Sequence, residues 1–413
     1  MIARTLRITS SLILIFLMGC ANLAQLLPQP APVSVPHVTS TPQPAPVATQ
    51  TSTQPVTETH ILRVWLPPRF DPNADTDSAK LLKLRLANFE AVHPRIKIEV
   101  RIKAESGDAS LLNALSVTSV AAPTALPDLV ALSRPDLEVA ALKGLIHPVD
   151  GLSTILHDPN WYPYARELGD IQNIGYGLPF AGDMLVLIHR PNLEFKTWDE
   201  IISSKEQLVF PAGDPQSLAL LALYVSASGK LVNEQGLPTL EEKPLTQTLT
   251  LIQNGLEKKI LLPAMINYET DVQSIQAYQD GRATVAIAWA TDSRSADVIQ
   301  LVPGLDKTTP HTFATGWSWA LAGSDPEVQQ VAAELAEYLI ADDFVGDWLK
   351  GSGFLPTRLS QNSDVNSILE AAHTVPANDV LSVLGPIMHQ ALTRILNGDQ
   401  VQSVVRSVLD QVK

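Results

Sequence analysis

The chain has 413 residues, of which 45% are hydrophobic and 17% charged, a composition typical of a well-packed globular protein. Its formal charge of −14, without any basic cluster, argues against a nucleic-acid partner. About 350 residues follow the N-terminal segments, more than one hydrophobic core usually holds, so two lobes are expected.

The first 20 residues have the layout of an export signal. Arg4 and Arg7 precede an apolar run at residues 12–18, which is too short to cross a bilayer because crossing takes about 20 apolar residues. Cys20 is the only cysteine of the chain, so it cannot form an internal disulfide. The preceding residues make LMGC, which resembles the bacterial lipobox, in which the cysteine is lipidated and becomes the mature N-terminus. We therefore expect a lipid anchor at Cys20; an ordinary signal peptide with a chance cysteine is the alternative.

Residues 21–60 have the composition of a tether. They include eight prolines, and Glu58 is their only charged residue. Such a segment cannot bury a core and stays extended. Its reach is on the order of 35 to 120 Å, depending on whether it is flexible or in the polyproline conformation.

The folded part opens with a predicted strand, helix and strand. Leu62–Leu66 is a short apolar strand, and Arg69 and Phe70 follow in the loop at its carboxyl end. Apolar residues at helical spacing begin at about Ser78 and stop before a His-Pro pair. Residues 96–102 then alternate apolar and charged side chains, which predicts a strand with one buried face.

The same order returns in the next segment. Residues 129–132 form a predicted buried strand, and Ser133 is placed to cap the helix that follows. Lys143 and Gly144 end that helix. Another strand is predicted at residues 285–288.

The C-terminal part is predicted to be mainly helical. Ser324 and Glu327 are spaced as a capping box at the start of one helix, and the chain from Val380 onward is predicted to be helical throughout. Alternating strands and helices predict an α/β protein, in which ligands bind at the carboxyl ends of strands.

Several segments taken together indicate a family. They are FEAVHPRIKIEV, PDLVALSRPDLEVAALKGLIHPVD, YGLPFAGDMLVLIHRP with TWDEI, YQDGRATVAIAWA, and GWSWALAGSDPEVQQVAAELAEYLI followed by GFLPTR. In this order, they resemble the extracellular solute-binding proteins of family 1, which include maltodextrin and other carbohydrate receptors of ABC importers. The resemblance covers nearly the whole chain after the tether.

The resemblance implies the type II periplasmic-binding-protein fold, an α/β fold with two lobes, a hinge, and the ligand in the cleft between the lobes. It places the crossings between lobes near residues 177–183, 310–315 and 351–358. Several glycines in and beside these segments suit a chain that absorbs large backbone changes. The implied lobes are residues 61–180 with 315–350, and residues 181–314 with 351–413.

Aromatic residues are the first candidates for binding a sugar, because a sugar presents an apolar face and a rim of hydroxyls. Trp289 ends a predicted strand, and the resemblance implies that it stacks on the sugar; a core position is the alternative. Trp317 and Trp319 would project from one face of a strand beside a proposed crossing. Phe70 and Arg69, at the end of the first strand, are further candidates.

Polar candidates complete the expected site. Asp183 can accept hydrogen bonds from two neighbouring hydroxyls, with capping of a turn as the alternative. Ser133 opens a helix after a predicted strand, and Arg358 ends GFLPTR, where it can clamp hydroxyls or an anion.

An exported hydrolase and a ligand sensor are the alternatives in function. A G-x-S-x-G elbow fails at the last position of residues 316–320, no H-E-x-x-H helix is present, and the nine histidines are scattered. We therefore expect no catalytic residues, no metal and no cofactor. The expected partners are a small solute, the permease subunits of an ABC transporter, and the membrane through the N-terminal lipid, with the protein a monomer. A sensor would instead present its closed form to a membrane receptor.

Overall fold

The structure is a computed structural model, and it describes residues 59–305, 310–359 and 363–412. The predicted signal peptide, Cys20 and nearly all of the predicted tether lie outside the described residues. The fold below is that of the compact unit that begins at Thr57.

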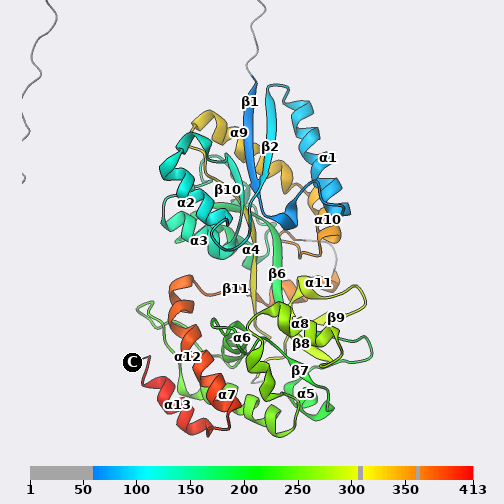
Figure 1. Ribbon diagram of the computed structural model, residues 1–413, viewed down its shortest axis with the longest axis vertical. Coiled ribbons are helices and arrows are strands. Elements are labelled where there is room, and N and C mark those ends of the chain that lie inside the picture. The colour runs from blue at the N-terminus through cyan, green and yellow to red at the C-terminus, as the bar shows by residue number, and fades with distance from the viewer. Residues whose placement is uncertain (1–58, 306–309, 360–362, 413) are drawn as a thin grey trace, which may run out of the picture. The chain divides into compact units, whose positions relative to one another are not determined.

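A mixed sheet of nine strands organises the described residues (Figure 1). The strand order is β2-β1-β3-β10-β6-β8-β7, with β11 beside β10 and β9 beside β6. Strands β1, β2 and β3 are parallel, whereas β10 is antiparallel to both β3 and β6. A separate pair, β4 with β5, is antiparallel. The strands are β1 His60–Leu66, β2 Ile96–Ile102, β3 Leu129–Ser133, β4 Asp170–Ile171, β5 Ile174–Gly175, β6 Gly177–His189, β7 Leu208–Val209, β8 Val285–Trp289, β9 Val298–Gln300, β10 Thr312–Leu321 and β11 Ala372–Thr374.

Helices pack around each end of this sheet and make two lobes (Figure 1). Lobe 1 surrounds β1–β3, and lobe 2 surrounds β7 and β8. The helices of lobe 1 are α1 Asp77–Val92, α2 Leu111–Ala121, α3 Arg134–Leu142, α9 Pro326–Leu339 and α10 Asp342–Ser352. Those of lobe 2 are α5 Trp198–Ser204, α6 Leu218–Ser226, α7 Glu242–Glu257, α8 Asp271–Gln279, α12 Asn378–Leu396 and α13 Val401–Leu409. Helices α4 Pro163–Gly169 and α11 Ser363–Glu370 contact each other.

Local sequence explains where the helices begin. Ser133 caps α3 as predicted, since its Oγ accepts a hydrogen bond from the backbone N–H of Asp136 at 3.4 Å. The predicted capping box from Ser324 is wrong. Asp325 caps α9 instead, and its carboxylate accepts from the N–H groups of Glu327 and Val328. Both residue types cap helices well, so the choice between adjacent positions depends on how the chain enters the helix.

Two further expectations change in detail. The predicted helix from Val380 onward is interrupted between α12 and α13, where Gly398 has a φ of 93°. The predicted buried face of β2 is only partly buried, because β2 is an edge strand; its Ile102 is 38% exposed.

The three predicted crossing segments lie side by side. Thr315 of β10 pairs with Asp183 of β6, and Leu355 exchanges two backbone hydrogen bonds with Gly182, at 2.9 and 2.8 Å. A Cβ at Gly182 would lie 2.2 Å from the hydroxyl of Tyr164, so only glycine fits this contact. All 13 residues of β6 are buried, and the strand pairs with β10 in one half and with β8 in the other. The lobe boundaries that follow from the resemblance stay a prediction.

Candidate functional site

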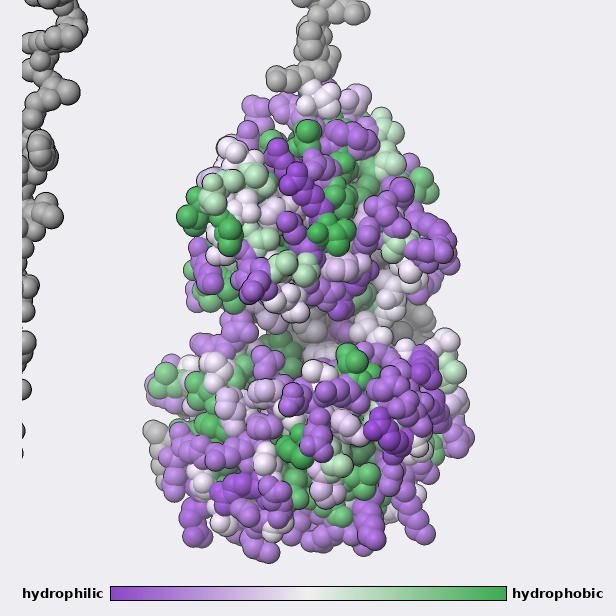
Figure 2. All heavy atoms as spheres, in the orientation of Figure 1, coloured by the Kyte–Doolittle hydropathy of each residue, from purple (hydrophilic) through white to green (hydrophobic). Residues whose placement is uncertain are grey.

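A cleft of about 450 Å³ lies beside these crossing strands and is lined by residues of both lobes. Figure 2 shows the surface hollowed between the lobes. A volume of this size suits a small-molecule ligand, since such pockets span about 300 to 1,000 Å³. Five of the eight predicted site residues line the cleft, namely Arg69, Ser133, Asp183, Trp289 and Trp317.

Two tryptophans contribute aromatic surface to the cleft. Trp289 is half-buried at the carboxyl end of β8, and Trp317 is contributed by β10. The guanidinium of Arg69 lies over the Trp317 ring at 5.3 Å and over the Phe354 ring at 5.9 Å. The aromatic rings come from both sides of the crossing, so a flat apolar solute face has surfaces to stack on.

Phe70 and Trp319 do not line the cleft. Each is 3% exposed and belongs to the aromatic core of lobe 1. Phe70 lies edge-on to both Phe180 and Trp317, with ring centroids 5.2 Å apart in each case, and Trp319 stacks on Phe180 at 4.5 Å. These rings support Trp317 from behind.

Arg358 also lies outside the cleft lining. Its guanidinium binds the carboxylate of Asp158 at 2.9 Å and lies 5.0 Å from the ring of Trp161. Arg358 therefore anchors the segment that follows α10 to the loop before α4.

Asp183 is 6% exposed and holds a turn of lobe 2 in place. Its Oδ1 accepts hydrogen bonds from the N–H of Met184 at 2.9 Å and of Thr291 at 3.2 Å. Its Oδ2 accepts from the Thr291 hydroxyl. Burial raises the pKa of Asp183 to about 7, although the Thr291 hydrogen bonds oppose this shift.

Two aspartates that the sequence reasoning missed lie close to Trp289. Asp271 is the first residue of α8, and Asp292 ends the turn after β8; both line the cleft. Burial raises the pKa of Asp271 to about 6, the charges of Asp292 and Asp214 add to the shift, and a hydrogen bond from the Trp289 side chain opposes it. Burial also raises the pKa of Asp292. The Oδ2 atom of Asp292 is buried and has no hydrogen-bond partner among the described residues.

A sequence signal existed for both. Each follows a threonine: Thr270 caps α8 just before Asp271, and Thr291 lies inside the short turn that Asp292 ends. Capping explains the first pair, and a Thr-Asp pair is common in turns, so this signal does not by itself indicate a ligand.

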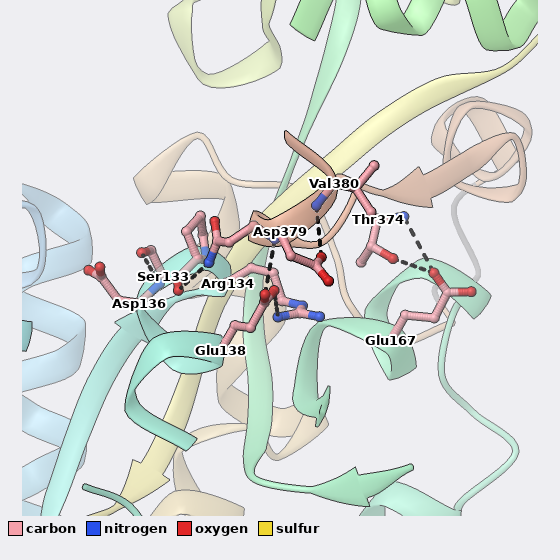
Figure 3. A network of polar contacts seen from close by, with 10 residues as sticks. Ser133, Arg134, Asp136, Glu138, Glu167, Thr374, Asp379 and Val380 are labelled. Atoms are coloured by element: carbon pink, nitrogen blue, oxygen red, sulfur yellow. Dashed lines mark hydrogen bonds and ion pairs between the residues drawn. The ribbon is translucent and has the colours of Figure 1, made fainter. Parts of the chain in front are cut away.

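The opposite side of the cleft contains a network that joins the two lobes (Figure 3). Arg134 of α3 binds Glu138 at 3.1 Å, and both side chains are largely buried. The other Glu138 oxygen accepts from the backbone N–H of Asn378, the first residue of α12, at 3.0 Å. The side-chain amide of Asn378 donates a hydrogen bond to the backbone carbonyl of Pro135. Burial lowers the pKa of Arg134, and the charge of Glu138 opposes the shift.

Two features are absent from residues 59–305, 310–359 and 363–412. No helix in this part of the chain has the length and apolar character needed to span a membrane. Within the same residues, no three His, Cys, Asp or Glu side chains gather in a way that could hold a metal ion.

The family follows from a comparison with protein-family models. The model described as "bacterial extracellular solute-binding protein" matches residues 85–373. The chain belongs to this family. Its members are binding proteins that act outside the cytoplasm, so the predicted family and the extracytoplasmic location are confirmed.

Solved structures confirm the two-lobed α/β fold of this solute-binding protein. The maltose-bound MalE3 of T. maritima is 15% identical, with a TM-score of 0.65 over 86% of this chain and 99% of that one. The cyclic alpha-maltosyl-1,6-maltose binding protein of Arthrobacter globiformis is 15% identical, with a TM-score of 0.70 over 86% and 98%. An ABC transporter solute-binding protein from Thermotoga lettingae, bound with alpha-D-tagatose, is 18% identical, with a TM-score of 0.63 over 86% and 100%. No curated protein matches the chain.

Proposed function

We propose that this solute-binding protein captures a sugar or oligosaccharide in the cleft, closes its lobes over the ligand and delivers it to an ABC importer. The observation that carries the proposal is the cleft itself, in which Trp289 and Trp317 lie among carboxylates at the crossing strands. Tryptophan rings stack on the apolar face of a sugar, and carboxylates accept its hydroxyl hydrogen bonds. Similar solved structures include a maltose-bound MalE3, a cyclic alpha-maltosyl-1,6-maltose binding protein and a solute-binding protein bound with alpha-D-tagatose, and they support the same ligand class.

The size of the expected interactions fits such a role. Micromolar binding needs about 8 kcal/mol. Two stacked rings and several hydroxyl hydrogen bonds, at about 1 kcal/mol each, approach this value before ordering costs. The proposed function needs no covalent step, so incubation with glycosides should release no product; sustained turnover would favour the hydrolase.

Binding and closure can be tested together. Purified protein is titrated calorimetrically with maltose, maltotetraose, glucose and tagatose, and small-angle scattering follows the radius of gyration. A ligand should bind at micromolar strength and make the protein more compact. Trp289→Ala should weaken that ligand at least about tenfold, whereas Trp289→Phe, which keeps an aromatic face, should lose less. Unchanged affinity in Trp289→Ala would place this ring outside the binding surface.

We also propose that Cys20 carries a lipid and that the segment at residues 21–60 tethers a monomeric receptor to the membrane. The support is the sequence pattern around Cys20 and the proline-rich composition that follows. Cys20→Ser should move the protein from the membrane fraction to the medium or periplasm. Retention of the variant in the membrane would contradict a lipid anchor at this residue.

Delivery to an importer has its own test. Membrane vesicles that contain the cognate permease should take up the ligand only when the protein and ATP are present. Ligand-dependent binding to a receptor kinase, without uptake, would favour the sensor instead.

A further inference from the structure

Acidic side chains outnumber basic ones in the lining of the cleft. Its two basic residues, Arg69 and Arg134, are each already paired with a carboxylate. Arg69 binds Glu105 through two hydrogen bonds of 2.7 and 2.6 Å, and Arg134 binds Glu138 at 3.1 Å. Because these two pairs are formally neutral, the charge of each arginine is largely offset by its own carboxylate.

Five other carboxyl groups line the same cleft and form no ion pair with a described residue. Most of them belong to lobe 2, and they come from separate elements: the middle of β6, the turn after β8, and the starts of α6 and α8. They are Asp183, Asp214, Glu269, Asp271 and Asp292.

These groups are close enough to repel one another. The charges of Asp292 and Asp214 add to the shift that burial causes in the pKa of Asp271, and the charge of Asp292 also raises the pKa of Asp183. Arg69 is near enough to lower the pKa of Asp292, yet burial still raises it. The protein thus holds several partly desolvated carboxylates together, and the nearby cation, Arg69, is already paired with Glu105, an arrangement that costs free energy.

Asp292 is the least satisfied of these groups. Its buried Oδ2 has no hydrogen-bond partner among the described residues, and the backbone of Trp289 and the charge of Arg69 only partly offset its burial. The hydroxyls of a neutral sugar can donate hydrogen bonds to such an oxygen, but they cannot cancel the repulsion between Asp292 and Asp271. An ammonium group does both, because a charge-assisted hydrogen bond is about twice as strong as a neutral one.

The aromatic surface favours the same ligand. Trp289 is close enough to Asp271 to oppose the rise in the pKa of that carboxyl, and Trp317 forms another part of the lining. Indole faces attract cations as well as the C–H face of a sugar ring. A sugar that carries an amine on its ring would meet both requirements at once.

We propose that the solute is a positively charged, amine-bearing sugar, with its ammonium group between Asp271 and Asp292 beside the Trp289 ring. This inference rests on the proposed function, since it adds a charge to the sugar expected in the same cleft. A neutral oligosaccharide, with the carboxylates acting only as hydroxyl acceptors, is the competing outcome.

A matched pair of disaccharides separates these outcomes. The glucosamine disaccharide of chitosan and its N,N′-diacetylated form share one skeleton and differ in the charge of the nitrogen. Calorimetric titration of the whole domain at mildly acidic pH should give at least about tenfold tighter binding of the free amine. Added salt should weaken the amine more than the acetylated sugar, because salt screens the charge interaction.

Two substitutions test where the ammonium group of the ligand binds. Asp292→Asn and Asp271→Asn should each remove most of the preference for the amine and leave the weaker binding of the acetylated sugar, which also reports that the variant is folded. Asp199→Asn, at an exposed residue of α5 that does not line the cleft, is the control and should keep the preference.

These experiments distinguish failure of the charge inference from failure of the proposed function. If the acetylated or another neutral sugar binds as tightly as the amine, the inferred charge is wrong while the proposed function stands. If spermidine binds and no sugar does, the charge inference holds and the carbohydrate proposal fails. If neither sugars nor spermidine bind, both proposals are overturned.

Discussion

Replacing Asp183 by asparagine should make the stability of the protein less dependent on pH. Burial raises the pKa of this carboxyl from 3.8 to about 7. Between these two values the folded state holds a proton that the unfolded state has released, so stability falls as pH rises and levels off above the folded pKa. At about 1.4 kcal/mol per pH unit, the loss between pH 5 and pH 7 is about 3 kcal/mol.

Asparagine can keep the hydrogen bonds of Asp183 without the charge. Its Oδ1 can accept from the N–H groups of Met184 and Thr291, and its Nδ2 can donate to the Thr291 hydroxyl. Between pH 5 and pH 8, the free energy of unfolding of Asp183→Asn should therefore rise by about 3 kcal/mol relative to that of the wild type.

Urea unfolding at both pH values, at constant salt, measures this gain directly. Asp199→Asn on the exposed face of α5 is the control, and its stability relative to the wild type should change little with pH. If Asp183→Asn differs from the wild type by the same amount at pH 5 and pH 8, the carboxyl is not neutral in the folded protein and the reasoning fails.

Three further substitutions test other parts of the fold. Trp319→Ala should cost about 3 to 5 kcal/mol of stability, because it leaves a cavity in the core of lobe 1. A smaller loss would mean that neighbouring side chains move in to fill the cavity. Gly316→Ala should cost about 1 to 3 kcal/mol, since its Cβ would lie 2.4 Å from the carbonyl oxygen of Ala181, whereas Gly346→Ala in α10, where a Cβ meets nothing within 4 Å, should be neutral or stabilising. Glu138→Gln should cost about 3 to 5 kcal/mol because it leaves a buried arginine without its countercharge, and thermal unfolding would contradict this if the midpoint were unchanged.

The elements of the fold could be predicted where local sequence determines them. Residues 129–133 are apolar and end in a serine, so both β3 and the cap of α3 followed from neighbouring residues. β6 was recognised only through the family resemblance, because a strand buried along its whole length has no alternating pattern to detect.

The candidate site was only partly predictable for a geometric reason. Arg69 and Phe70 are adjacent in a short helical turn at residues 68–70, which directs one side chain toward the cleft and the other into the core. Their order along the chain does not reveal which is which. Asp271 and Asp292 are 21 positions apart, and their proximity depends on the start of α8 facing the turn after β8. Tertiary packing alone brings them together.

The position of β10 in the sheet affects the order of folding. β10 lies between β3 and β6, yet it begins at Thr312, whereas those strands end at Ser133 and His189. Until the ribosome has made β10, lobe 1 lacks its middle strand and leaves two unpaired strand edges, which can pair wrongly with other chains. Lobe 1 and its side of the cleft therefore cannot be completed early in synthesis, and the long separation of these strands along the chain should make folding slower than in a protein whose strands pair in sequence order.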